Sequence, residues 1–142
     1  MSQPNRGLPH YLFICVHNAG RSQMAAAICD RLAGGRARAS SAGTQPAPHI
    51  NPTVVEALAE IGIDISTRQP QLLSDDLAAG AQRVIAMGCS IEEACPSIRT
   101  DENWDLLDPA GRSLAEVRAI RDEIYQRVQG LLERAATPSG KT

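Results

Sequence analysis

Short apolar runs alternate with amphipathic stretches along most of this chain. The apolar runs predict strands over residues 11–14, 36–42, 83–87 and, briefly, 103–106. The amphipathic stretches predict helices that begin at Ser22, at Asn51-Pro52 and after Ser74, and a longest helix over residues 114–131. Because strands and helices alternate, we expect an α/β fold with a parallel sheet covered on both faces. We expect one domain over residues 1–142, with an ordered core over about 10–136 and frayed ends.

The bulk composition disfavours several classes of partner. The chain has 142 residues and a net charge of −2, which argues against nucleic acid or an anionic membrane. No apolar run approaches the roughly 18 residues of a membrane span. The polar, proline-containing start does not resemble a secretory signal. We therefore expect a cytoplasmic protein with no membrane or nucleic-acid partner.

The cysteine content calls for an explanation. In a reducing cytoplasm these residues should be thiols, which favours catalysis, metal binding or redox chemistry over structural disulfides. Metal binding is the weakest of these, because the cysteines and the three histidines are scattered without zinc-site spacing. We expect no metal and no cofactor. The cysteines are Cys15, Cys29, Cys89 and Cys95.

A cysteine and an arginine bracket a polar loop at the end of the first predicted strand. Cys15 ends that strand and Arg21 opens the next helix. Ligands bind at the carboxyl ends of the strands in open α/β sheets, and a loop entering a helix there directs backbone N–H groups at an anion. Arg21 can hold two oxygens of a tetrahedral anion, and Ser22 can donate a hydrogen bond to a Cys15 thiolate. The residues between them are Val16, His17, Asn18, Ala19 and Gly20.

We call residues 15–22 the anion loop. The helix N-terminus and Arg21 should favour the thiolate form of Cys15. We expect His17 to contribute only its backbone, with its side chain turned away from the anion. The alternative interpretation is a buried, inert cysteine at a strand end with a surface arginine.

The anion loop, followed by Gln23-Met24-Ala25, resembles the low-molecular-weight tyrosine phosphatase superfamily, and most closely its thioredoxin-coupled arsenate reductases. The sequence Ser41-Ala42-Gly43-Thr44 after the second strand also resembles the family pattern. The resemblance covers about residues 11–132. It implies a three-layer sandwich with a four-stranded parallel sheet in the order 2-1-3-4.

Asp108-Pro109 is a second candidate element. Pro109 fixes the backbone, so the carboxyl group of Asp108 can be held out on a rigid turn and can protonate a leaving oxygen. Taken alone, Asp-Pro is most often a plain turn. The resemblance implies that Asp108 is the catalytic acid. Phosphatases of this fold usually carry an aromatic residue after the proline, and Ala110 in that place argues against a phosphotyrosine substrate.

Cys89 and Cys95 are the elements that favour reduction over ester hydrolysis. The resemblance implies a relay: Cys15 forms a thiol–arsenate adduct, Cys89 attacks Cys15 and releases arsenite, and Cys95 passes the disulfide to thioredoxin. Arsenate is then the substrate, with phosphate or sulfate as mimics. The alternatives are two ordinary buried thiols, reduction by mycothiol or another small thiol, a tyrosine phosphatase, and a non-catalytic oxyanion-binding or redox-sensing protein.

The spacing of this pair predicts a conformational change. On an intact helix Cys89 and Cys95 would lie about 9 Å apart along the axis and on different faces. A disulfide requires Cα atoms within about 7 Å of each other. We therefore predict that residues 89–98 unfold locally on oxidation.

Three further expectations concern single residues. Cys29 falls on the apolar side of the first helix and should be plain core packing. His10 is expected on the surface. Arg121 belongs to a charged side of the last helix that should face solvent, with Glu116, Arg118 and Asp122.

Overall fold

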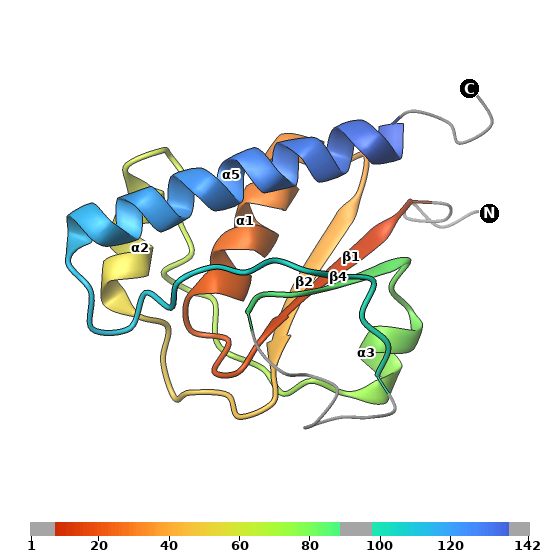
Figure 1. The fold of residues 1–142 in the computed structure, drawn as a ribbon, viewed down its shortest axis with the longest axis horizontal. Coiled ribbons are helices and arrows are strands. Elements are labelled where there is room, and N and C mark those ends of the chain that lie inside the picture. Colours follow the sequence, from red (N-terminus) through yellow and green to blue (C-terminus); the bar gives the residue numbers. More distant parts are fainter. Residues whose placement is uncertain (1–7, 89–97, 137–142) are drawn as a thin grey trace.

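A computed structural model describes residues 8–88 and 98–136, which form a sheet covered by helices on both faces (Figure 1). All strand pairings are parallel and the strand order is β2-β1-β3-β4, so the predicted fold is confirmed. Cys89 and Cys95 lie outside the described residues, as does most of the segment 89–98. The strands are β1 (His10–Cys15), β2 (Arg38–Gly43), β3 (Arg83–Ala86) and β4 (Glu102–Asn103). The helices are α1 (Arg21–Ala33), α2 (Pro52–Ala59), α3 (Asp75–Ala79) and α5 (Leu114–Ala136).

The central strand β1 is buried on both faces, and its alternating side chains divide the core in two. Tyr11, Phe13 and Cys15 pack into a large apolar cluster built mainly with α1, α2 and α5. Leu12 and Ile14 point to the opposite face and join a smaller cluster under α3. The face that carries Cys15 is therefore the more thickly covered one, and α5 packs across both α1 and α2 on that side (Figure 1).

Two strands begin or end two or more residues from their predicted bounds, because local polar groups are used elsewhere. Strand β2 begins at Arg38 and not at residue 36, because the Arg36 guanidinium donates to the Leu32 and Ala33 carbonyls and completes the end of α1. The last strand was predicted over 103–106. It covers only Glu102–Asn103, because the chain then turns away and the Leu106 carbonyl accepts from Arg21.

The predicted starts of the second and third helices are confirmed by their caps. The Asn51 side chain accepts from the backbone N–H of Thr53, and Pro52 occupies the first turn of α2. The Ser74 hydroxyl accepts from the N–H of Leu77 at the start of α3. None of the helices within residues 8–88 and 98–136 has both the length and the hydropathy to cross a membrane.

Two surface expectations are wrong. His10 is buried, with its Nε2 2.8 Å from the Ser40 hydroxyl, and burial lowers the pKa of its imidazole. Arg121 is also buried, and its guanidinium donates to the Ala57 carbonyl and to Glu60. In both cases a polar group enters the interior because it meets a partner from a distant part of the chain, which periodicity does not report.

Candidate active site

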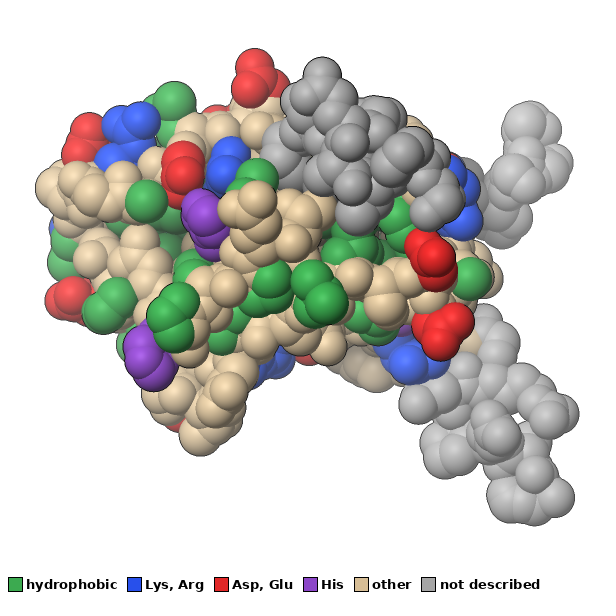
Figure 2. Space-filling model, turned by 90° about the horizontal axis from the view of Figure 1, so that it is seen from below, with side chains coloured by type: hydrophobic (Ala, Val, Ile, Leu, Met, Phe, Trp, Pro, Cys, Tyr) green, Lys and Arg blue, Asp and Glu red, His purple; other side chains and the backbone are tan. Residues whose placement is uncertain are grey.

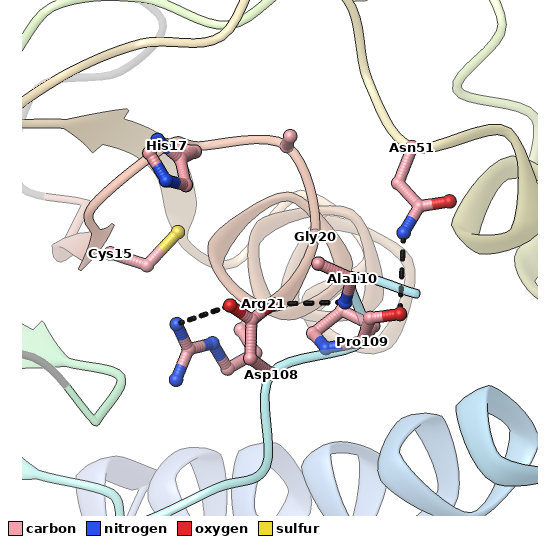
Figure 3. A pocket seen from close by; sticks show the side chains of 9 residues that line it. Cys15, His17, Gly20, Arg21, Asn51, Asp108, Pro109 and Ala110 are labelled. Carbon is pink, nitrogen blue, oxygen red and sulfur yellow. Dashed lines mark hydrogen bonds and ion pairs between the residues drawn. The ribbon is translucent and has the colours of Figure 1, made fainter. Parts of the chain in front are cut away.

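A small pocket lies at the carboxyl end of β1, between the anion loop and the turn that follows Leu107 (Figure 3). Its volume is about 70 Å³, which suits a small anion or the anionic group of a larger molecule. The structure thus brings Cys15, Arg21 and Asp108 together, although Asp108 is 87 residues from Arg21 in the chain. The pocket is lined by Cys15, His17, Ala19, Gly20, Arg21, Asn51, Asp108, Pro109 and Ala110.

Three carbonyl groups of the anion loop point outward, towards residues 45–51. The carbonyls of Val16, His17 and Ala19 accept from the backbone N–H groups of Gln45, Ala47 and Asn51 at 2.8 to 2.9 Å. In a planar trans peptide the N–H of the next residue points the opposite way. The N–H groups of His17, Asn18 and Gly20 therefore face the inside of the loop, where an anion would lie.

A chain of hydrogen bonds links the Cys15 sulfur to the side chains of Ser22 and Asn18. The Cys15 Sγ lies 2.8 Å from the Ser22 Oγ, and the Asn18 Nδ2 lies 2.7 Å from the same Oγ. Because an amide N–H can only donate, it occupies an acceptor position of the serine oxygen and leaves the serine hydrogen free to point at sulfur. Ser22 can thus donate to a Cys15 thiolate, which only accepts, and Asn18 holds the serine oxygen in place.

Asn18 is the centre of this support. Its φ is 52°, a left-handed conformation that asparagine tolerates better than most residues. Its Oδ1 accepts from the Gln23 side chain at 3.0 Å and from the backbone N–H of Gln71 at 2.9 Å. Gln71 is 53 residues away, and no local pattern in the sequence identified its contact with the loop.

The Arg21 side chain is only 10% exposed and forms the cationic wall of the pocket. Its Nη1 donates to the Leu106 carbonyl at 3.2 Å, and its Nη2 lies 3.9 Å from a carboxylate oxygen of Asp108. The bond to Leu106 holds the guanidinium plane in place, while Nη2 remains on the side that faces Asp108 (Figure 3). The arginine therefore joins the anion loop to the chain that carries the carboxylate.

The Asp108 turn is fitted closely against the anion loop. The Asp108 Oδ1 accepts from the N–H of Ala110 at 3.0 Å, which fixes the carboxylate on the turn (Figure 3). Pro109 packs so tightly against Gly20 that a Cβ there would lie 2.5 Å from the proline Cγ. The side chain of Asn51 approaches the Pro109 carbonyl from the start of α2. Sequence reasoning identified Asn51 only as a helix cap and missed its place in the pocket.

His17 is among the residues that line the pocket, and it is exposed. Its Nδ1 lies 3.1 Å from the Gln45 carbonyl, on the side of the loop to which the loop carbonyls point. Because a carbonyl oxygen only accepts, this contact requires a hydrogen on Nδ1. The backbone pairing of residues 16–17 with 45–47 brings Gln45 within reach of the ring, and the sequence offers no local signal for this pairing.

Cys29 has the role of core packing that its position predicted. It is fully buried in α1, and burial with the neighbouring Asp30 carboxylate raises the pKa of its thiol to about 12. It therefore remains a protonated, unreactive group near neutral pH.

Hydrophobic side chains run across the middle of the face that Figure 2 shows. Most of the described charged side chains on this view lie towards its margins. Two large apolar residues on loops at the carboxyl edge of the sheet are more than half exposed, Leu72 at 62% and Leu107 at 61%.

The family model described as "Low molecular weight phosphotyrosine protein phosphatase" matches residues 10–138. The chain belongs to this family. Its relatives in the family include a Halobacterium salinarum protein named provisionally as an arsenate reductase, 40% identical over 126 residues, which cover 85% of this chain and 89% of that protein. The arsenate reductase of Brevibacillus brevis is 34% identical over 124 residues, 85% of this chain and 92% of its own length. The resemblance drawn from the anion loop is thus confirmed.

Solved structures of low molecular weight phosphatase relatives show the same fold. The thioredoxin-dependent arsenate reductase of Corynebacterium glutamicum is 38% identical, with a TM-score of 0.75 over 91% of this chain and 62% of that one. The YwlE arginine phosphatase of Geobacillus stearothermophilus is 27% identical, with a TM-score of 0.80 over 91% of this chain and 94% of that one. One scaffold therefore carries both reductases and phosphatases.

Proposed function

We propose that this protein reduces arsenate to arsenite. The observation that carries the proposal is the convergence of the Cys15 thiol, the Arg21 guanidinium and the Asp108 carboxylate on one small pocket. Inward-facing N–H groups and a buried cation suit a tetrahedral oxyanion. The names of the 40% and 34% identical relatives favour arsenate as that anion. Phosphate and sulfate have the same shape and should compete for the site.

In the first step the Cys15 thiolate attacks arsenic. A sulfur–arsenic bond forms and an arsenic–oxygen bond breaks. Asp108, in its protonated form, gives its proton to the departing oxygen, which leaves as water. Arg21 and the loop N–H groups balance the negative charge on the remaining oxygens. Ser22 stabilises the thiolate before the attack, through the 2.8 Å contact between its Oγ and the sulfur.

In the second step the Cys89 thiolate attacks the Cys15 sulfur. A disulfide forms, the electron pair of the sulfur–arsenic bond passes to arsenic, and arsenic(V) leaves as arsenic(III). Cys95 then attacks Cys89, which frees Cys15, and the dithiol of thioredoxin reduces the Cys89–Cys95 disulfide. Gly88, which immediately precedes Cys89, lies against Arg21, and this supports Cys89 as the attacking thiol.

A coupled assay tests the reaction and the reductant together. We expect arsenate-dependent oxidation of NADPH with thioredoxin and thioredoxin reductase, abolished in both Cys15→Ser and Cys95→Ser. Cys29→Ser is the matched control and should retain turnover, since Cys29 is buried away from the pocket. If Cys95→Ser instead keeps full turnover with mycothiol, a small thiol is the reductant. Absence of arsenate-dependent oxidation with either system would overturn the proposal.

The second candidate is a phosphatase, because the YwlE arginine phosphatase shares the fold. The first chemical step would be the same, with phosphorus in place of arsenic, but Cys89 and Cys95 would have no part in it. Phosphatase activity that survives Cys89→Ser and Cys95→Ser, without any arsenate reduction by the unmodified protein, would favour this candidate.

A further inference from the structure

Gly88 lies two residues after the end of β3, beside the Arg21 side chain that lines the pocket. Its φ is +80°, in the region that favours glycine. A Cβ at this position would lie 2.8 Å from the Arg21 Nη1 and 3.2 Å from the Leu106 carbonyl oxygen. These two atoms are the donor and the acceptor of the hydrogen bond that fixes the guanidinium. A side chain at residue 88 would therefore occupy the space in which Arg21 bonds to the Leu106 carbonyl.

We propose that Gly88 is a positioning residue for oxyanion binding: its lack of a side chain allows Arg21 to bond to Leu106 and so to face the anion. This inference rests on the oxyanion-binding role proposed for Arg21. The bond has two effects, because it orients the cation and also ties the anion loop to the chain that leads into Asp108. A methyl group at residue 88 would disturb both.

The identity of the nearest atom decides how the molecule would respond. The nearest atom, Nη1, is the far end of a flexible side chain and can move away. The backbone oxygen of Leu106, at 3.2 Å, would need to shift by only a few tenths of an ångström. Arg21 would therefore swing away to admit the methyl group, and the fold would remain. The predicted result is a folded protein with a displaced guanidinium, and so a defect in anion binding that exceeds the defect in stability.

Gly35 offers a matched control. It also has a positive φ, +90°, but no heavy atom of the described chain lies within 4 Å of its Cβ position. It follows α1, whose 13 residues span about 20 Å from the pocket. Gly35→Ala thus introduces the backbone strain of a left-handed alanine without the contact to Arg21.

The test compares phosphate binding and thermal unfolding in Gly88→Ala and Gly35→Ala. We expect similar losses of Tm, but about tenfold or more weaker phosphate binding only in Gly88→Ala. Equal phosphate affinity in Gly88→Ala and the unmodified protein would overturn the proposal. Because inorganic phosphate is the probe, a protein that binds phosphate but does not reduce arsenate would refute the reductase proposal and leave this one standing.

A second variant covers the case in which Gly88→Ala does not fold. If the obstacle is the contact with Arg21, then Gly88→Ala should be tolerated in an Arg21→Ala background, where the tip of the side chain is gone. Recovery of a cooperative unfolding transition in the double variant supports the proposal. Failure of the double variant to recover would contradict it.

Discussion

The Ser22 hydroxyl lies 2.8 Å from the Cys15 sulfur and accepts from Asn18, which leaves its own hydrogen free. A Cys15 thiolate can only accept, so Ser22 is the donor in that form. A hydrogen bond to a charged group contributes about 1.5–3 kcal/mol. Ser22→Ala should therefore slow the alkylation of Cys15 by iodoacetamide at pH 7 about tenfold or more. Ser74→Ala is the control: it removes a helix cap and about 1 kcal/mol of stability, but should not change the alkylation rate. Equal rates in Ser22→Ala and the unmodified protein would show that the hydroxyl does not stabilise the thiolate.

Two substitutions of Asn18 should distinguish the effect of backbone strain from the effect of losing its side-chain hydrogen bonds. Asn18→Gly keeps the left-handed backbone without strain but loses the bonds to Ser22, Gln23 and Gln71. Asn18→Ala loses the same bonds and adds strain at φ 52°. We expect both variants to lose turnover, with the alanine variant less stable than the glycine variant by about 1 kcal/mol in urea unfolding. Equal stability of the two would mean that the loop relaxes out of this conformation.

Gly20→Ala should disturb the position of the Asp108 turn more than it disturbs anion binding by the anion loop. Its Cβ would lie 2.5 Å from the rigid Pro109 ring, so the turn has to move outward with its carboxylate. We expect the turnover number to fall at least tenfold while the inhibition constant of phosphate changes less. Gly130→Ala in α5 is the control, and should leave both constants unchanged. A phosphate constant that changes as much as the turnover number would contradict this separation.

The thiol of Cys29 should resist alkylation in the folded protein. Burial raises the pKa of its thiol to about 12, so almost none is ionised at pH 8. Mass spectrometry of the folded protein treated with iodoacetamide at pH 8 should find Cys15 alkylated and Cys29 intact, and phosphate should protect Cys15. Alkylation of Cys29 at the rate of Cys15 would contradict the burial of the thiol.

Glu60 makes stability depend on pH. Hydrogen bonds from Arg118, and then from Arg121, hold the pKa of its carboxyl group at about 2, below the usual 4.5. Because the pKa is lower in the folded state, the stabilisation is complete above pH 4.5 and is lost as the pH falls towards 2. The Tm difference between the unmodified protein and Glu60→Gln should thus be largest at pH 7 and shrink below pH 4.5. A difference that does not vary between pH 7 and pH 3 would refute the assignment.

The features that could be predicted from the sequence are those that depend on residues close together in the chain. The strand before Cys15, the helix after it and the contact from Ser22 all follow from residues within one loop, and the strand order came from the family resemblance. The contacts of Asn18 with Gln71 and of Arg21 with Leu106 were not predictable, because they join segments 53 and 85 residues apart. The contact of His17 with the Gln45 carbonyl was not predictable for the same reason.

The unequal covering of the sheet has a consequence for how the molecule can move. The supports of the anion pocket, including the buried side chain of Cys15, belong to the thick layer formed with α1, α2 and α5. The other layer rests on the five residues of α3 and a smaller apolar cluster that reaches Ile98. A rearrangement confined to the α3 side would leave the apolar contacts of the thick layer intact. The sheet thus separates the layer that holds the anion pocket from the smaller apolar layer on its other face.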